Sequence, residues 1–301
     1  MTSTSKYERL PISVGVCVYN EEKNIALLLR SLLSQKTERV EIKEVIIISS
    51  GSTDRTDAIV SDFFKNSANF ELLIQKKREG KASALNLFFE HASHEILAIV
   101  NGDIILNEDT IEKLVSPLHD PGVGMTGGHP VPVNDRNRLI GFTDHLLWNL
   151  HHLISLKNPK LGEIIALRNV VRIPDDTAVD EAWIEAIIKS KGFRILYVPE
   201  AIVYNRGPET ISDFLKQRRR IFAGHLHIKR KTGYKLSTMD SLDILLLTLK
   251  SLKFNIRDIL YTPGAILLEL MGRALGIYDF YIRRRNPYIW DAIRTTKEVQ
   301  K

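Results

Sequence analysis

The scarcest feature of this 301-residue sequence is cysteine, of which there is one, Cys17, so no disulfide can form within the chain. No stretch of about 18 uninterrupted apolar residues occurs, which argues against a membrane-spanning helix. The N-terminal segment MTSTSKYERLP also lacks the basic start and apolar stretch of a secretory signal peptide. Together these absences predict a cytoplasmic protein, whose contact with a membrane would be peripheral.

Motifs of several common enzyme classes are absent as well. The first apolar run, ISVGVCVY, is not followed by the GxGxxG of dinucleotide-binding folds, and neither a GxxxxGK[ST] loop nor a GxSxG elbow occurs. None of the nine histidines has a cysteine or carboxylate partner at a spacing typical of zinc sites. Dehydrogenase, P-loop, hydrolase-triad and zinc chemistry therefore find no support.

The composition is that of a folded protein with an excess of positive charge. Hydrophobic residues make up 44% of the chain, charged residues make up 26%, and the formal net charge is +6. A basic protein favours anionic partners, such as nucleotide-linked substrates, nucleic acids or anionic membrane surfaces. Because no segment has the aromatic and basic pattern of a nucleic-acid-binding module, we expect no nucleic-acid partner.

The first part of the chain alternates between apolar, strand-like runs and helical patterns. Strands are expected at residues 12–19, 42–50, 70–75 and 95–106, each followed by a helix. This order predicts an α/β fold with a mostly parallel sheet flanked by helices. The later pattern is mixed, with strands or hairpins expected at 123–134, 164–174 and 193–208 and helices at 139–156, 180–192 and 210–233.

Polar residues follow the first four expected strands at their carboxyl ends, where ligands bind in parallel sheets. In chain order these segments are Tyr19 to Glu21, Ser49 to Asp54, Arg78 to Lys81 and Asn101 to Asp103. Because the strand ends meet at one edge of the sheet, the four segments predict a single binding site there.

Asp103 interrupts the apolar run AIVNGDIIL. Gly102 beside it allows a ligand or another backbone segment to approach closely. A carboxylate at the sheet edge suits Mg²⁺ or Mn²⁺, since such a cation takes one or two carboxylates and completes its shell with substrate phosphates and water. The alternative is an aspartate that caps the following helix.

Three other segments contain residues suited to phosphate or proton chemistry. The loop KKREGK places Lys81 at a helix N-terminus, where basic residues suit a diphosphate or form an exposed charge run. Asp180 and Glu181 open another helix, which they either cap or supply with a general base. Gln217 and Arg220 share one face of a basic helix, which contacts a departing diphosphate or faces solvent or membrane.

Taken together and in this order, these segments resemble glycosyltransferase family 2, whose members are inverting enzymes with the glycosyltransferase A-type fold. The resemblance covers residues 11 to 230 and rests on VCVYNEEKNI, SSGSTDRT, REGKASALN, NGDIIL, VDEAWIEAIIKSKGFRILYVPEAIVYNRGPET and QRRRIFAGH. It implies a nucleoside diphosphate sugar as donor, expected to be UDP-linked. It also implies a divalent cation, Mg²⁺ or Mn²⁺, and a single displacement that inverts the anomeric carbon.

The resemblance also implies roles for individual residues. It assigns the nucleotide sugar to Tyr19, Glu21, Ser49, Lys81, Asn101, Gly102, Asp103, Gln217 and Arg220. Within this set, Asp103 is the expected metal ligand, and Gln217 and Arg220 are expected to close over the leaving group. Glu181, or its neighbour Asp180, is expected to take the proton of the acceptor.

Three residues depart from the family pattern. Asn101 replaces the first Asp of the DxD motif, and Ser49 replaces an Asp that contacts the nucleotide base. Ile221 replaces the Trp of QxxRW, which argues against a processive polysaccharide synthase. The changes at Asn101 and Ser49 weaken the expected contacts with the metal and with the base of the nucleotide, but Asp103 is retained as the expected metal ligand.

The chain becomes more hydrophobic beyond residue 236, and we divide it into a catalytic domain, 1–236, and a C-terminal helical segment, 237–301. The segments GAILLELMGRALGIYDFY and WDAIRTTK resemble the tail of membrane-associated family members. An apolar stripe is formed by Leu242, Leu245, Leu246 and Leu249, with Lys250 and Lys253 near its end. Because Glu269, Arg273 and Asp279 would be costly inside a bilayer, amphipathic helices that pack on the domain or lie in the interface are expected.

An interfacial helix followed by Arg283 to Arg285 would contact the anionic cytoplasmic face of a membrane. Such a position would suit a polyprenyl or other lipid-linked acceptor with a hydroxyl or phosphate group. Flotation with anionic liposomes tests this hypothesis.

Two other functions stay open from the residues alone. A nucleotidyltransferase would share the nucleotide-binding sheet but would have no use for the predicted base and leaving-group residues. A non-catalytic relative that binds a nucleotide sugar or lipid would account for Ser49, Asn101 and Ile221. Metal-dependent release of nucleotide from a panel of donors distinguishes these functions from a glycosyltransferase.

Overall fold

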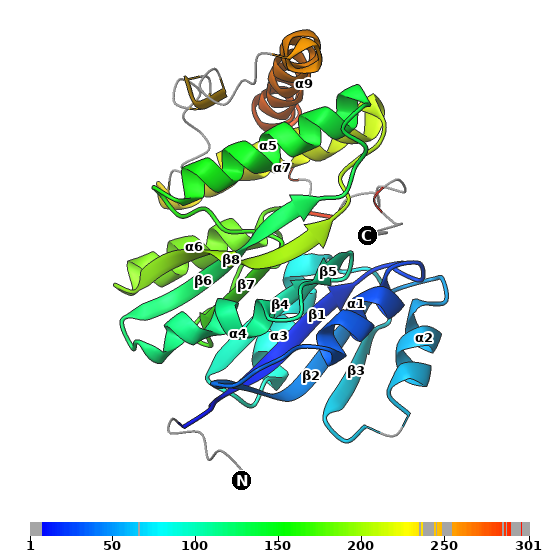
Figure 1. The fold of residues 1–301 in the computed structure, drawn as a ribbon, viewed down its shortest axis with the longest axis vertical. Helices are drawn as coiled ribbons and strands as arrows, with labels where there is room; N and C mark the ends of the chain where they lie inside the picture. Colours follow the sequence, from blue (N-terminus) through cyan, green and yellow to red (C-terminus); the bar gives the residue numbers. More distant parts are fainter. Residues whose placement is uncertain are drawn as a thin grey trace.

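The computed structural model describes residues 8–65, 67–234, 236, 244, 246–248, 255–284, 286, 288–289 and 296. Its core is an eight-stranded sheet with the order β3-β2-β1-β4-β7-β6-β8-β5 (Figure 1). The strands are β1 Leu10–Val18, β2 Val40–Ser50, β3 Phe70–Gln75, β4 Ile96–Asn101, β5 Ile104–Leu106, β6 Val123–Pro132, β7 Ile164–Arg168 and β8 Arg194–Asn205. The helices are α1 Ile25–Leu33, α2 Thr56–Phe63, α3 Lys81–His91, α4 Thr110–Val115, α5 Leu139–Ser155, α6 Asp180–Ser190, α7 Ile211–Thr232 and α9 Ile256–Tyr281.

The neighbouring strands β3, β2, β1 and β4 are parallel. Helices α1 and α4 pack on one face of the sheet, and α3 and α6 pack on the other. Because both faces are covered, the central strands are buried on both sides, which explains their continuous apolar sequences. The predicted α/β fold with a mostly parallel sheet flanked by helices is confirmed.

The apolar run 95–106, predicted as one strand, forms two. β4 ends at Asn101, and β5 begins at Ile104 and pairs with β8 at the far edge of the sheet. The chain turns at Gly102, where an added Cβ would lie 2.8 Å from Val18 Cγ1. Asp103 therefore lies in a turn at the sheet edge and not inside a strand.

The hairpin considered for residues 164–174 is also absent from the described structure. Only β7 forms there, and it lies antiparallel between β4 and β6. Since both edges of β7 are occupied, no position remains for a returning strand. The chain beyond Arg168 instead contributes Val171 and Ile173 to the core beside α3 and α6.

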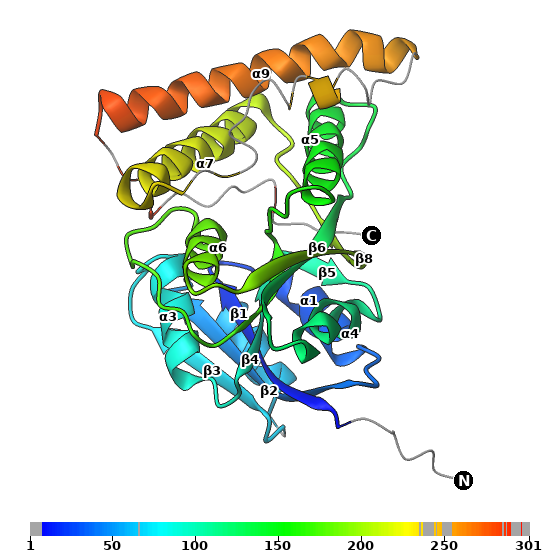
Figure 2. The ribbon, with the colours of Figure 1, turned by 90° about the vertical axis from the view of Figure 1, so that its left-hand side faces the viewer.

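Helices α5, α7 and α9 form a layer above the sheet, which we call the helical cap, and α9 lies on the side of α7 remote from the sheet (Figure 2). Two glycines allow α9 to approach α7 closely. A Cβ at Gly272 would lie 2.6 Å from Arg218 Cβ, and a Cβ at Gly276 would lie 2.9 Å from the backbone oxygen of Arg219. Thr210 caps the start of α7, because its side chain accepts a hydrogen bond from the Asp213 amide.

The acidic residues of α9 face α7. Glu269 accepts a hydrogen bond from Arg218 Nε at 2.7 Å, and Asp279 is paired with Arg219. Exposed apolar residues lie along the rest of α9 and just beyond it: Ile256, Ile259, Leu260, Leu267, Leu270, Met271, Ile277, Tyr278, Tyr281 and Ile282. None of the helices in the described ranges has the length and apolar character needed to cross a membrane.

Part of the predicted C-terminal pattern lies outside the described residues. This part comprises Leu242, Leu245, Leu249, Lys250, Lys253, Arg285 and the segment WDAIRTTK apart from Thr296.

Candidate active site

A cavity of about 400 Å³ lies between the ends of β1 and β4, the start of α6 and the inner side of the helical cap. All predicted site residues except Ser49 line it: Tyr19, Glu21, Lys81, Asn101, Gly102, Asp103, Asp180, Glu181, Gln217 and Arg220. The fold therefore brings the sheet-edge segments together with the two pairs that come from later helices.

Ser49 is placed differently from the prediction. It is fully buried at the end of β2, and its Oγ donates a hydrogen bond to Ser52 Oγ at 2.9 Å. Ser50 lines the cavity in its place. Because successive side chains of a strand point to opposite faces, the two serines cannot both face the same site.

The end of β1 supplies Tyr19 and Glu21, separated by Asn20 in the left-handed region (φ 53°). The guanidinium of Arg78 lies over the Tyr19 ring, 3.9 Å from its centre. Glu21 is nearly buried and accepts a hydrogen bond from Asn24 Nδ2 at 3.0 Å. Of the basic loop KKREGK, Arg78 and Lys81 line the cavity, so this loop contributes two cations to it.

Asp103 presents its carboxylate to the cavity from the turn after β4. Burial raises the pKa of this carboxyl, while the charges of Lys81 and Arg220 act in the opposite direction. Within the described part of the chain, no cation forms an ion pair with Asp103. A buried carboxylate in this situation would be stabilised by a bound cation.

Glu163 is a cavity residue that the sequence did not reveal. Its backbone is left-handed (φ 62°), which is uncommon for residues other than glycine, and its Oε2 accepts a hydrogen bond from Asn101 Nδ2 at 3.0 Å. Burial and the negative charge of Asp103 raise the pKa of Glu163 to about 7. The segment KLGEIIALRN holds no signal for this role, because the partner, Asn101, lies 62 positions away.

Asp180 and Glu181 begin α6, and both contact the ammonium of Lys81. Lys81 Nζ lies 2.8 Å from Asp180 Oδ2 and 2.9 Å from Glu181 Oε1. Lys81, predicted near the diphosphate, is thus held by the two predicted bases. The Glu181 side chain is 23% exposed and that of Asp180 is 6% exposed, so Glu181 is the more accessible base.

The pKa values of the two acids move in opposite directions. Burial, and then the charge of Glu181, raise the pKa of Asp180. Burial also raises the pKa of Glu181, but the charge and hydrogen bond of Lys81 outweigh it and the net pKa is lowered. Glu181 is therefore ionised at neutral pH and able to accept a proton.

Gln217 and Arg220 reach the cavity from one face of α7, as their spacing predicts. Burial lowers the pKa of Arg220 to about 10, although four carboxylates attract its charge. These are Asp103, Glu163, Asp180 and Glu181. Arg220 thus carries a positive charge at neutral pH between the turn after β4 and the start of α6.

Comparison with family models identifies two matches. The model described as glycosyl transferase family 2 matches residues 13–177. The model described as glycosyl transferase family group 2 matches residues 96–276.

Two curated proteins illustrate the relatives. Glycosyltransferase AglE of Haloferax volcanii is 34% identical over 129 residues, which is 43% of this chain and 41% of AglE. Poly-beta-1,6-N-acetyl-D-glucosamine synthase of Staphylococcus aureus is 27% identical over 221 residues, which is 69% of this chain and 52% of the synthase. The chain thus spans about half the length of the curated relatives it matches, or less.

Solved structures show the same fold. Mannosyltransferase PcManGT from Pyrobaculum calidifontis, in complex with GDP-Man and Mn²⁺, has a TM-score of 0.64 at 20% identity and covers 92% of this chain and 88% of its own. S. aureus TarS 1–349, in complex with UDP-GlcNAc, has a TM-score of 0.50 at 19% identity and covers 95% of each chain.

Proposed function

The chain belongs to glycosyltransferase family 2, and from that premise we propose that it transfers a sugar from a nucleoside diphosphate sugar to an acceptor oxygen, with inversion at the anomeric carbon. One observation carries the proposal. Asp103, Glu181 and Arg220 come from three distant parts of the chain and line one cavity. They supply a metal ligand, a base and a cation for the leaving group.

The donor is a nucleoside diphosphate sugar, and we keep UDP as the expected nucleotide. Structures of the fold contain GDP-Man in one case and UDP-GlcNAc in another, and both donors have a diphosphate. Arg78 and Arg220 provide positive charge in the cavity for that diphosphate. Ser50, not Ser49, is the hydroxyl available to the nucleotide.

The surroundings of Asp103 fit a divalent cation, Mg²⁺ or Mn²⁺. Asp103 would be its direct ligand, and Glu163 offers a second carboxylate on the same side of the cavity. No cluster of three or more metal-binding side chains occurs within the described ranges, so substrate phosphates and water would complete the shell. When bound, the cation would neutralise charge on the diphosphate and so stabilise its departure.

The protein residues divide the remaining work. Glu181 accepts the proton of the acceptor hydroxyl as the acceptor oxygen forms a bond to the anomeric carbon. The bond from that carbon to the phosphate oxygen breaks. Arg220 and Gln217 then stabilise the negative charge on the leaving nucleoside diphosphate. Lys81 holds Glu181 in position, and the more buried Asp180 holds Lys81.

We also propose that residues 1–236 form the catalytic domain and that 237–301 form a helical segment at the cytoplasmic face of a membrane. The exposed apolar residues of α9 support this, since Arg257 lies near their start and Arg283 and Arg284 follow them. A polyprenyl or other lipid-linked acceptor would suit this position. Glu269 and Arg273 of α9 line the cavity, so the segment also contributes to the site.

Release of nucleoside diphosphate from UDP- and GDP-sugars, with Mg²⁺ or Mn²⁺ present, tests the proposed function. We expect turnover of one donor and a loss of at least about a hundred-fold in Asp103→Ala. Asp62→Ala is the matched control, because Asp62 is an exposed carboxylate on α2 that pairs with Lys65. This control should retain wild-type turnover.

The other functions predict different results. Full activity in Asp103→Ala would contradict the role of Asp103. Nucleotide binding without turnover of any donor, with lipid and soluble acceptors supplied, would indicate a non-catalytic binding protein. Release of pyrophosphate from a nucleoside triphosphate would indicate a nucleotidyltransferase.

A further inference from the structure

The wall of the cavity under the helical cap contains a group of residues that the donor does not require. We call this wall the inner chamber, and it comprises Trp148, His151, Lys160, Ile221, Phe222 and His225. They come from α5, from the connection between α5 and β7, and from α7. Three of them are polar, and the other three are aromatic or apolar.

Lys160 is the cation of the inner chamber. Its ammonium has no hydrogen bond or ion pair with any residue in the described ranges, although it lines the cavity. Among the acids, Glu185 has the largest effect on the pKa of Lys160. Its carboxylate accepts hydrogen bonds from other groups, the Leu161 amide at 2.8 Å and the Tyr234 hydroxyl at 3.0 Å. A cation removed from bulk water without a partner is unfavourable, so an anion bound beside Lys160 would stabilise it.

Two histidines accompany Lys160 and lack side-chain hydrogen bonds within the described residues. His151 and His225 are each 7% exposed, and His151 Nδ1 is buried without a hydrogen-bond partner. Burial, and then the charge of Lys160, hold the pKa of both well below the usual range. Each neutral imidazole can donate one hydrogen bond, so the inner chamber combines one ammonium with two neutral donors.

The acids on the same side of the cavity do not cancel this charge. Glu269 lies in ion pairs with Arg218 and Arg273, at 2.7 Å and 2.8 Å. Burial raises the pKa of Asp144 to about 7, so it is only partly ionised at neutral pH. The inner chamber therefore favours an anion.

We propose that the inner chamber binds the acceptor through a phosphate group, with Lys160 as its cationic contact. The proposal rests on the proposed glycosyl transfer, because Lys160 lines the same cavity as the base Glu181. A phosphate at Lys160 would thus hold the acceptor in the cavity that contains this base. Trp148, Ile221 and Phe222 would pack against whatever carries the phosphate, which is either an isoprenoid chain or a sugar ring.

Calorimetric titration of the full chain with matched pairs of probes tests the proposal and distinguishes the two carriers. One pair is farnesyl phosphate and farnesol, and the other is N-acetylglucosamine 1-phosphate and methyl N-acetylglucosaminide, each with nucleoside diphosphate and Mn²⁺ present. For one pair, the phosphate should bind at least about ten-fold more tightly than its uncharged counterpart. The pair that shows this difference identifies a lipid or a soluble acceptor.

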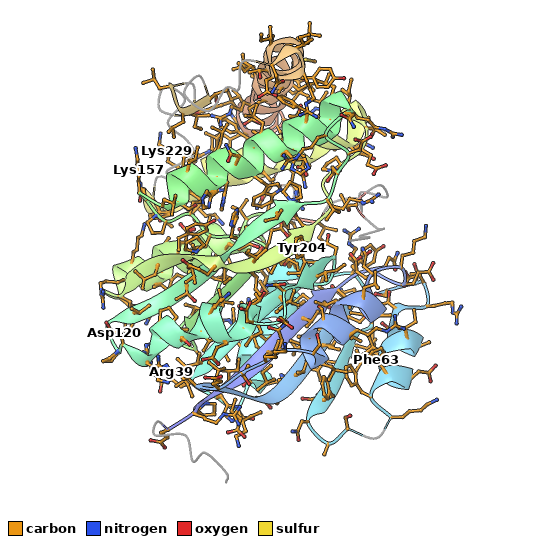
Figure 3. The ribbon with its side chains drawn as sticks, viewed as in Figure 1. Arg39, Phe63, Asp120, Lys157, Tyr204 and Lys229 are labelled. Carbon is orange, nitrogen blue, oxygen red and sulfur yellow. The ribbon has the colours of Figure 1, made fainter. Side chains whose placement is uncertain are left out.

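Variants assign the effect to Lys160. Lys160→Met should weaken binding of the phosphate probe at least about ten-fold, and Lys160→Arg, which keeps the charge, should restore most of it. Lys157→Met is the matched control, because Lys157 is exposed at the periphery beyond the end of α5 (Figure 3). This control should bind the probe like wild type.

Two results would overturn the proposal. One is equal affinity for the charged and uncharged members of both pairs, and the other is an equal loss in Lys160→Met and Lys157→Met. Binding of nucleoside diphosphate with Mn²⁺ provides the independent measurement. If Lys160→Met retains this nucleotide binding and Asp103→Ala loses it, the Lys160→Met variant is folded. The proposed donor site is then supported independently of the results with the acceptor probes.

Discussion

The sheet edge and the helical cap form opposite walls of the cavity, and they are held in place by different interactions. On the sheet edge, Asp103 follows β4 directly, and its position is fixed by the hydrogen-bonded strands around it. In the cap, α7 and α9 are joined by side-chain ion pairs such as Arg218–Glu269, 51 positions apart. The backbone therefore positions Asp103 at the sheet edge, whereas side-chain ion pairs hold α7, which carries Gln217 and Arg220, against α9.

Because the two walls are held in place differently, we expect substitutions that affect catalysis to be distinct from substitutions that affect stability. A conservative change at the sheet edge or at the start of α6 should stop catalysis while leaving the fold intact. A change in the ion pairs between α7 and α9, or on the outer surface of α9, should alter the free energy of unfolding or the contact with a membrane, with smaller effects on donor binding. The predictions below test this separation, beginning with the largest expected effect.

The largest effect is expected at the start of α6. Glu181→Gln removes the accessible base and should lower the rate of sugar transfer by about 100- to 10,000-fold. Asp180→Asn, its matched variant, should lower the rate by less, since the Asp180 side chain is only 6% exposed and contacts Lys81. Steady-state assays of nucleoside diphosphate release measure both rates, and circular dichroism checks the fold. A larger loss in Asp180→Asn would reverse the assignment of the base.

The next effect concerns the pH dependence of stability in the cap. Burial raises the pKa of Asp144 to about 7, whereas an aspartate in the unfolded chain releases its proton near pH 4. Between these values the folded state binds more protons, so the free energy of unfolding falls as the pH rises from about 4 to about 7. The asparagine in Asp144→Asn cannot titrate. The free energy of unfolding of this variant should therefore decrease by up to about 4 kcal/mol less than that of wild type over this pH range.

Urea denaturation at pH 5 and pH 7.5 measures the difference. Glu163, whose pKa burial also raises to about 7, contributes in the same direction, so some pH dependence should persist in Asp144→Asn. Asp62→Asn, at an exposed position, should keep the wild-type profile. Identical profiles for Asp144→Asn and wild type would show that Asp144 is ionised in the folded protein throughout this range.

The same difference between the two walls explains what the sequence could predict. Strands and helices of the first half are visible as apolar runs and periodic patterns, and the sheet-edge residues follow them directly in the chain. Asp103 could therefore be predicted as a site residue, although its run divides into β4 and β5 instead of forming one strand. The pairing of β5 with β8 joins Ile104 to Asn205, and no local pattern encodes such a distant contact.

Other parts of the site could not be predicted for related reasons. Glu163 and Lys160 are recognisable only from the cavity they line, since their partners or lack of partners depend on the fold. The orientation of Ser49 relative to Ser50 depends on the exact register of β2. The sequence indicated that the charges of α9 disfavour a membrane span, but it did not show that Glu269 and Asp279 face α7 and leave apolar residues exposed.

A third prediction tests the ion pairs of the cap. Arg218→Met removes the partner of Glu269, whose side chain is 12% exposed, and leaves it with Arg273. Loss of one member of a largely buried pair should lower the free energy of unfolding by about 2 to 3 kcal/mol. Thermal and urea denaturation measure this loss. Lys65→Met removes the exposed pair with Asp62 and should have no measurable effect, and an equal effect of the two changes would contradict the distinction between them.

The smallest effect is expected on the outer surface of the cap, where membrane contact is proposed. Leu260 and Leu267 are 66% and 58% exposed on α9. If each contributes about 1 kcal/mol by entering the membrane interface, replacing both with glutamate should weaken binding to vesicles about thirty-fold. Flotation with vesicles that contain anionic lipid, at low salt, measures the bound fraction. Turnover of a soluble donor should stay unchanged in the double variant, because neither leucine lines the cavity.

The control for flotation is Leu33→Glu, at a leucine that is 57% exposed on α1, a helix that lies beside the sheet and not in the cap (Figure 2). Since Leu33 lies far from α9, this variant should float like wild type. Absence of wild-type flotation at low salt would remove the membrane proposal and leave the apolar surface of α9 to another partner. Equal flotation of wild type and the double variant would place the membrane contact outside α9.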